Sequence, residues 1–314
     1  MEQVDIRMPV AQSVQVARLA HKRARRLKEG AIEAVLFLCA LSAVATTVAI
    51  VVILLYESLG FFEVVSLREF LTGTVWTPLF SNPQYGVLPL VAGTVTTAGV
   101  ALVVAVPLGL VTAIYLSEFA PHGVRETVKP FLELLEGVPT VVYGYFALLF
   151  VTPLLQKLMP ELPGFNMLSP GIVIGIMIIP YVSSVSEDAM RAVPMSLREG
   201  SYAMGATRFQ TAIKVVLPAA LSGVVAAFIL GISRAVGETM VVAVAAGQQP
   251  NFTFNPTESA ATITAYIVQV ALGDLPHGSI AYQSIFAAGL VLVLMTLAFN
   301  VIGHLLRRSF RERY

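Results

Sequence analysis

The chain has 314 residues, of which 56% are hydrophobic and only 12% are charged. Soluble domains carry about 25% charged residues, so this composition excludes a disordered protein, a nucleic-acid-binding protein and most cytosolic enzymes. The single cysteine, Cys39, excludes an intrachain disulfide framework and a metal cluster held by cysteines. The composition therefore predicts a protein of the lipid bilayer.

Six apolar stretches follow one another along the chain, and each approaches or exceeds the roughly 20 residues that a spanning helix needs. They cover residues 31–56, 87–116, 137–155, 169–185, 219–247 and 279–306. We therefore expect an all-α membrane protein with about six transmembrane helices, and five or seven spans are the alternatives.

Basic residues are concentrated in every second connection. Seventeen of the 20 lysines and arginines lie before the first span, after the second, after the fourth or after the sixth. The opposite loops hold only Arg68 and Lys157, and Arg234 lies inside the fifth span. Because cytoplasmic loops are enriched in Lys and Arg, this asymmetry predicts that both termini lie in the cytoplasm.

The first 30 residues are basic, and they are more polar and longer than the start of a cleaved signal peptide. The cluster between Lys22 and Lys28 has two interpretations. It is either a topology signal alone or a segment that rests on anionic lipid headgroups.

The loop after the fourth span, residues 187–218, has the pattern of two short helices. Residues 196–199 (SLRE) and 207–210 (TRFQ) each match a capping box, and Gly205 suits the position just after a helix end. The first short helix carries more apolar side chains than a solvated loop needs, which predicts a partner that covers it. These side chains are Met195, Leu197, Tyr202, Ala203 and Met204.

Three parts of this loop resemble the EAA loop of ABC-importer permeases: Glu199-Gly200-Ser201, then Gly205, then the run from Val215 to Leu217-Pro218. The sequence departs from the family pattern at Gly200, Ser201 and Val215. The resemblance implies a coupling helix that docks in a groove of a separate ATP-hydrolysing subunit. The contact is then carried by Glu199, Gly200, Ser201, Gly205, Leu217 and Pro218. An ordinary amphipathic loop is the alternative.

Further blocks resemble the permeases of phosphate ABC importers. They are GT at 93–94, AVPLG at 105–109, YLSE at 115–118, GVPTVVYG at 137–144 and RAVGETM at 234–240. The resemblance implies a type I permease fold, a multi-pass position in the bacterial inner membrane, and inorganic phosphate as the substrate. Another oxyanion, such as sulfate, molybdate or a phosphonate, is the alternative. The run at 237–240 favours one of the two companion permease subunits of such importers.

The resemblance also implies how the chain is organised into segments and which partners it has. We expect a cytoplasmic basic segment at 1–30, a first span with its outer loop at 31–86, a permease core at 87–306 and a cytoplasmic tail at 307–314. The implied partners are a second permease subunit, two ATP-binding subunits and a phosphate-binding protein. ATP and magnesium belong to the ATP-binding subunits, so we expect no cofactor on this chain.

Two charges, Arg234 and Glu238, lie inside the fifth predicted span. Their four-residue spacing places them on one face of a continuous helix, where they either neutralise each other or line a substrate path. The guanidinium fork of Arg234 matches a phosphate oxyanion. On this hypothesis Glu238 holds Arg234 in the closed state and yields as phosphate passes.

Four hydroxyl-bearing residues are candidates for the same path, and helix packing is the alternative for each of them. They are Ser233, Thr239, Thr140 and Tyr143.

Catalytic motifs are absent from the sequence. No lysine follows a glycine, so the chain has no phosphate-binding loop of an ATPase, and it has neither an H-E-x-x-H nor a G-x-S-x-G motif. The histidines, including His122, His277 and His304, lack metal-ligand spacing. We therefore expect a transport subunit with no catalytic or metal site, and an intramembrane enzyme is the rival interpretation.

Overall fold

The computed structural model describes the backbone of residues 10–309 and the side chains of residues 28–306. Within this range the regular elements are helices, and β structure is limited to one bridge between Trp76 and Tyr85. Five helices are long and apolar enough to cross a bilayer, and one bent helix pair raises the number to six when it is taken as a single span. The predicted all-α membrane fold is therefore confirmed.

The chain separates into two compact units, residues 1–56 and 57–314. The first is formed by most of helix α1 (Val10–Val64), and every side chain from Lys28 to Ile53 is exposed. A helix that is apolar on all sides and exposed on all sides has the pattern of a lipid-facing span. The other bases of the segment 1–30 lie outside the described side chains, and so do those of the tail.

Four long helices build the second unit. They are α3 (Leu88–Ile114), α7 (Leu168–Arg191), α11 (Leu221–Gly237) and α14 (Ile280–Ser309). Glycines on α7 let α3 approach closely, because a Cβ on Gly175 would lie 2.7 Å from the carbonyl oxygen of Ala101. The core between these helices is made of small and branched side chains, among them Ala101, Ala105 and Ile174. Close packing of small residues is the usual way in which membrane helices associate.

The second and third predicted spans each contain a π turn. Helix α3 continues into η1 (Tyr115–Phe119), and the third span is made of α5 (Thr140–Phe146), η2 (Ala147–Val151) and α6 (Thr152–Leu158). The third span begins at Thr140, three residues after the predicted start, because Pro139 precedes the first turn and has no N–H to extend it backwards.

The fifth predicted span, residues 219–247, is not one helix. The chain forms α10 (Leu217–Ala219), α11 and α12 (Met240–Ala245), and the segments on the two sides of Ala220 are bent by 73°. Helix α11 ends at Gly237, because Glu238 has extended backbone angles, φ −64° and ψ 132°. The prediction of a continuous fifth helix is therefore wrong.

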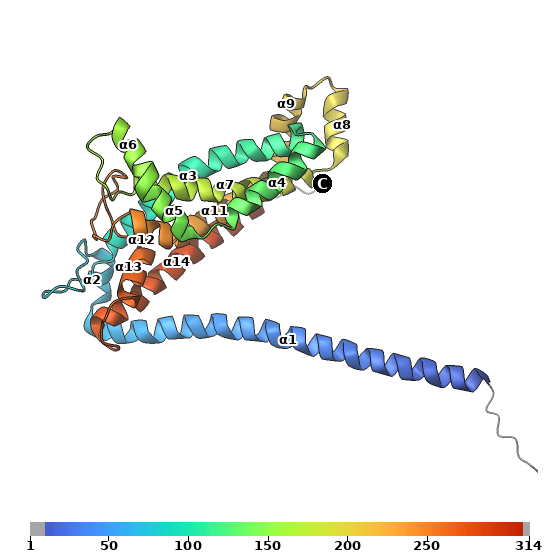
Figure 1. Ribbon diagram of the computed structural model, residues 1–314, viewed down its shortest axis with the longest axis horizontal. Coiled ribbons are helices and arrows are strands. Elements are labelled where there is room, and N and C mark those ends of the chain that lie inside the picture. The colour runs from blue at the N-terminus through green and yellow to red at the C-terminus, as the bar shows by residue number, and fades with distance from the viewer. Residues whose placement is uncertain (1–9, 310–314) are drawn as a thin grey trace, which may run out of the picture. The chain divides into compact units, whose positions relative to one another are not determined.

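The connecting helices gather at two opposite ends of the second unit (Figure 1). One end holds α4 (His122–Glu136), α8 (Met195–Ala203) and α9 (Arg208–Thr211), and the other holds α2 (Leu67–Thr72), α6 and α13 (Ile263–Ala271). The bases of the predicted cytoplasmic loops lie at the first end, whereas Arg68 and Lys157 belong to α2 and α6. For the described bases of the second unit, the charge asymmetry of the sequence is therefore a separation in space. The first end is called the basic end below.

The end opposite the basic end is held together by aromatic rings. Trp76 is 1% exposed and makes edge-to-face contacts with Phe70, Tyr85 and Tyr266. Such contacts add about 0.5–1.5 kcal/mol each to the burial of the rings. The predicted outer loop 57–86 is therefore a folded cap that contains α2.

Candidate functional site

The two short helices of the predicted coupling loop are present, but only one of the two predicted capping boxes is formed. The backbone N–H of Gln210 donates to Thr207 Oγ1 at 3.2 Å, and the N–H of Thr207 donates to Gln210 Oε1 at 2.9 Å. The prediction of a capping box at 196–199 is wrong. Helix α8 begins at Met195, directly after Pro194, so Ser196 already lies inside the first turn. Gly205 has φ +81° and closes the turn between the helices, as predicted.

Helix α8 is attached to the membrane helices through Arg198. This side chain is buried, and Nη2 donates to Glu118 Oε1 on η1 and to the carbonyl oxygen of Met190, both at 2.9 Å. Nη1 donates to the carbonyl oxygen of Val193 at 2.6 Å. Arg198 therefore links α8 to η1 at the end of α3 and to the last turn of α7. Sequence reasoning counted Arg198 only as a topological charge.

The outer face of this loop is apolar and uncovered within the described chain. Met195 is 61% exposed, Met204 is 88% exposed and Phe209 is 65% exposed. Leu197 instead turns inward and packs against the cluster around Met190. The apolar face is defined here as Met195, Tyr202, Met204 and Phe209, and it has the properties of a protein-binding surface.

The residues of the EAA resemblance lie on and around this loop. Glu199 and Gly200 are exposed on α8, whereas the hydroxyl of Ser201 forms a hydrogen bond of 2.8 Å with the hydroxyl of Thr211. Leu217 is half-buried and Pro218 is exposed at the start of α10.

Arg234 lies in the last turn of α11, and its Nη1 atom pairs with Glu136 Oε1 at the end of α4. The two side chains are 30% and 33% exposed. The guanidinium also lies 5.7 Å from the ring centre of Tyr181 on α7, within cation–π distance. The sequence hypothesis that Glu238 pairs with Arg234 is therefore wrong, because the helix ends between them and Glu136 is the partner.

Glu238 has a different role. It is 9% exposed, and its Oε1 atom accepts from the backbone N–H groups of Met240 at 3.2 Å and Val241 at 3.4 Å. Its own carbonyl oxygen accepts a 2.8 Å hydrogen bond from Thr264 Oγ1. Glu238 thus organises the break between α11 and α12.

Three of the four hydroxyl candidates have hydrogen-bond partners other than Arg234. The hydroxyl of Tyr143 donates to the carbonyl oxygen of Leu135 at 2.7 Å, one residue before Glu136, which is the partner of Arg234. Ser233 donates to Asn300 Oδ1 at 3.4 Å, and Thr239 donates to the carbonyl oxygen of Gly237 at 3.1 Å. The fourth candidate, Thr140, is half-buried at the first position of α5.

Helix α4 is fastened to α7 by a group of ion pairs. Glu187 is fully buried and lies 2.8 Å from Arg125 Nε and 3.0 Å from Lys129 Nζ, which also reaches Asp188 at 3.0 Å. Burial alone lowers the pKa of Lys129, but its hydrogen bonds to Asp188 and Glu187 outweigh this effect, so the pKa is raised above its ordinary value. Lys129 therefore stays charged at any physiological pH.

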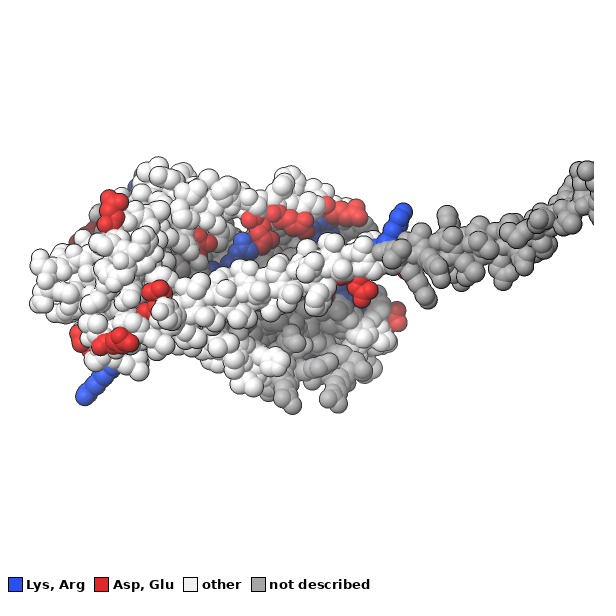
Figure 2. Space-filling view, turned by 90° about the horizontal axis from the view of Figure 1, so that it is seen from below, with Lys and Arg blue, Asp and Glu red and all other residues white. Residues whose placement is uncertain are grey.

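A pocket of about 330 Å³ lies between α4 and α7, beside the Arg234–Glu136 pair. Charged side chains of α4 and α7 line it together with Tyr181. These charged groups are Lys129, Glu133, Glu136 and Glu187. Figure 2 shows one face of the molecule, on which acidic and basic groups lie side by side on a largely uncharged surface.

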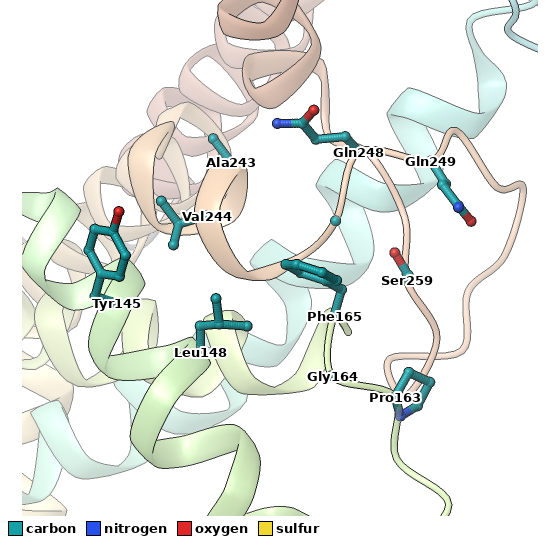
Figure 3. A pocket seen from close by; sticks show the side chains of 11 residues that line it. Tyr145, Leu148, Pro163, Gly164, Phe165, Ala243, Val244, Gln248, Gln249 and Ser259 are labelled. Carbon is teal, nitrogen blue, oxygen red and sulfur yellow. The ribbon is translucent and has the colours of Figure 1, made fainter.

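A larger pocket, of about 810 Å³, lies at the other end of α5 and α12 (Figure 3). Its polar lining consists of Tyr145, Gln248, Gln249 and Ser259, and no charged side chain takes part. Gly247 has φ +95° there, and a Cβ would lie 2.1 Å from Ser259 Oγ, so only glycine fits. Sequence reasoning missed this pocket. Among the described side chains, no group of three or more His, Cys, Asp or Glu is placed to hold a metal ion.

Sequence comparison gives a family and several relatives. Residues 105–314 match the family described as "Binding-protein-dependent transport system inner membrane component". The chain is 37% identical to the "Probable ABC transporter permease protein YqgH" of Bacillus subtilis over 91% of its own length and 93% of the relative. It is 34% identical to the "Phosphate transport system permease protein PstC" of Xylella fastidiosa, over 78% of its length and 80% of the relative.

Solved structures of ABC importers share the fold. A bacterial ABC transporter involved in the import of the acidic polysaccharide alginate has a chain that aligns with a TM-score of 0.60 at 17% identity, over 88% of the present chain and 96% of that one. The MetNI methionine ABC transporter in an inward-facing conformation aligns with a TM-score of 0.52 at 20% identity, over 72% and 95%. At these identities the likeness concerns the fold alone.

Proposed function

Because the chain belongs to the family of binding-protein-dependent transport system inner membrane components, we propose that it is one permease subunit of an ATP-driven importer of inorganic phosphate. It is a multi-pass inner membrane protein and a transport subunit rather than an enzyme. In the proposal it forms half of the translocation pathway, and a second permease subunit forms the other half.

The observation that carries the substrate assignment is the position of Arg234. It projects from the last turn of α11, between α4 and α7, where a guanidinium can offer two parallel N–H groups to an oxyanion. A charge within the bilayer is costly and marks a functional site by default. Relatives named PstC, at 34% identity over 78% of this chain, support phosphate as that oxyanion.

The apolar face on α8 and α9 is the proposed docking surface for the ATP-binding subunits. Its exposed side chains, Met204 above all, are those that a partner groove covers, and Glu199 and Gly200 are exposed beside them. When ATP closes the two ATP-binding subunits, α8 moves, and Arg198 passes the movement to η1 and α7. ATP and magnesium are held by those subunits.

The basic end faces the cytoplasm in this proposal, since Lys and Arg favour that side. The opposite end, with α2, α6 and α13, then receives a phosphate-binding protein. The run at 237–240 supports a PstC-like subunit, which pairs with a PstA-like permease, PstB-like ATP-binding subunits and a PstS-like binding protein.

The test is ATP-dependent uptake of labelled phosphate into proteoliposomes that contain the assembled complex and its binding protein. Unlabelled phosphate should compete, and sulfate, molybdate and a phosphonate should compete at least tenfold less well, a ratio of about 1.4 kcal/mol in binding. Absence of phosphate uptake, or stronger competition by another of these oxyanions, would overturn the substrate assignment.

A further inference from the structure

The ion pair between Arg234 and Glu136 joins two helices that are far apart in the sequence. Glu136 is the last residue of α4, which belongs to the basic end, whereas Arg234 belongs to the membrane helix α11. We propose that Glu136 is the counter-ion that closes Arg234 to the transported anion, and that it must leave Arg234 before the anion can bind there. The inference rests on the proposed function, in which Arg234 receives the substrate.

A carboxylate and a transported oxyanion compete for the same donors. The guanidinium offers its N–H groups in a planar fork, and an acceptor already seated on Nη1 excludes a second anion from that edge. Glu136 therefore acts as an internal competitor. It also neutralises an arginine that is costly to leave unpaired in the membrane, so the resting state is stable without substrate.

The pocket beside the pair strengthens this closure. Its charged lining is three glutamates and Lys129, so its charge balance is negative, and the withdrawal of Glu136 makes it less negative. Such a pocket repels an anion that approaches Arg234 from this side. Withdrawal of Glu136 removes both the competitor and part of the repulsion.

The C-terminal end of helix α4 is attached in a way that permits the withdrawal of Glu136. None of the 15 residues of α4, all within the described part of the chain, is buried, and ion pairs of Arg125 and Lys129 with α7 hold the helix in place. These pairs involve Glu187, which is fully buried, so they anchor the body of α4. The Glu136–Arg234 pair at its C-terminal end is 33% and 30% exposed, and a half-exposed pair of this kind opens at little cost. After Glu136 the chain passes through Gly137 and Pro139 into α5, so α4 is not continuous with a membrane helix.

Glu238, the other acid near Arg234 in the sequence, lacks this capacity. Its carboxylate is 9% exposed and is occupied by the backbone N–H groups of Met240 and Val241. Moving it would leave those donors unpaired and would unfold the start of α12.

The experiment compares Glu136→Gln with Glu133→Gln in the full complex. Glu133 is on the same helix and lines the same pocket, and the structure gives its side chain no ion pair within the described residues. Two quantities are measured without binding protein: the basal ATPase rate in proteoliposomes, and the binding of labelled inorganic phosphate to the nucleotide-free complex.

For Glu136→Gln we expect a basal ATPase rate and a phosphate affinity that are each raised about two- to fivefold, the range expected when a half-exposed charged pair is removed. Glu133→Gln removes an equal charge from the pocket lining without freeing Arg234, so it measures the repulsion alone, and each quantity should rise by less than about twofold. Adding Arg234→Gln to Glu136→Gln should abolish the gain in phosphate affinity. Equal behaviour of the two glutamine variants, or a gain in affinity that survives the loss of Arg234, would overturn the proposal.

The outcome can be separated from that of the proposed function. In one outcome the wild-type complex takes up no phosphate, while Glu136→Gln raises the basal ATPase rate more than Glu133→Gln does. This outcome supports the counter-ion role and shows that phosphate is the wrong anion. If phosphate uptake is normal and Glu136→Gln changes neither the rate nor the affinity, the transport function is supported and the counter-ion role is wrong.

Discussion

Two arginine–glutamate pairs in this chain have the same chemistry and different surroundings. Arg198 and Glu118 keep only 10% and 7% of their side chains exposed, and Arg198 also donates to two backbone carbonyls. Arg234 and Glu136 keep 30% and 33% exposed, beside a polar pocket. A buried charge that loses its partner is far more costly than one that water can reach. The first pair is therefore suited to permanent attachment and the second to exchange of partners.

Arg198→Ala removes the first pair, and we expect it to lower the stability of the complex more than any other variant described below. It leaves the buried Glu118 without its cationic partner and removes the side-chain donor from the carbonyl groups of Met190 and Val193, which we expect to cost about 3–5 kcal/mol. A fall in the melting temperature of the purified complex, with loss of the co-purified ATP-binding subunit, is the measurement. Arg191→Ala is the control, because Arg191 is 49% exposed and 3.8 Å from Glu187, and it should cost about 0.5 kcal/mol or less. Similar losses in the two variants would contradict the permanent role of Arg198.

Arg234→Lys should separate charge from geometry at the second pair. Lysine keeps the positive charge but lacks the fork that binds an oxyanion through two N–H groups, so ATP-driven phosphate uptake should fall about tenfold. The melting temperature should stay near that of the wild type, because the site is half-exposed. Wild-type uptake by this variant would show that charge alone suffices.

Gly205→Ala tests whether the turn after α8 requires a glycine at this position. An L-residue at φ +81° is strained, and we expect a cost of about 1 kcal/mol, seen as a lower melting temperature and weaker retention of the ATP-binding subunit. Gly200→Ala is the matched control, since Gly200 lies within α8 with open space around its Cα. Alanine should stabilise that helix by up to about 1 kcal/mol. The same sign in both variants would refute the assignment of strain to Gly205.

Tyr181→Leu should have the smallest effect. It removes the ring that lies 5.7 Å from the Arg234 guanidinium, a contact worth about 0.5–1 kcal/mol, and should raise the basal ATPase rate about two- to fivefold. Tyr181→Phe keeps the ring and should behave like the wild type. A phenylalanine variant as active as the leucine variant would assign the effect to the hydroxyl instead.

Patterns of short range predicted the fold well. The apolar stretches located the long helices, Thr207 and Gln210 predicted the start of α9, and Gly205 predicted the turn before it. Each of these signals lies within one continuous segment of the sequence, so it can be recognised without knowing the tertiary contacts.

The candidate site depends on contacts of long range, and these escaped the sequence. Spacing suggested that Arg234 and Glu238 share a helical face, which holds only while the helix continues. The carboxylate of Glu238 satisfies backbone donors of the next helix and helps to end the first one. Glu136 lies 98 positions before Arg234 and is its partner because α4 packs against α7. No local sequence pattern predicts this packing.

The break at Glu238 also determines what occupies the positive end of the α12 helix dipole. Each α-helix carries partial positive charge at its N-terminus, and in many proteins a bound anion settles there. At the start of α12 that place is already taken by the carboxylate of Glu238. The chain supplies its own resident anion, so the backbone does not compete with Arg234, and recognition is left to a side chain that can change its partner.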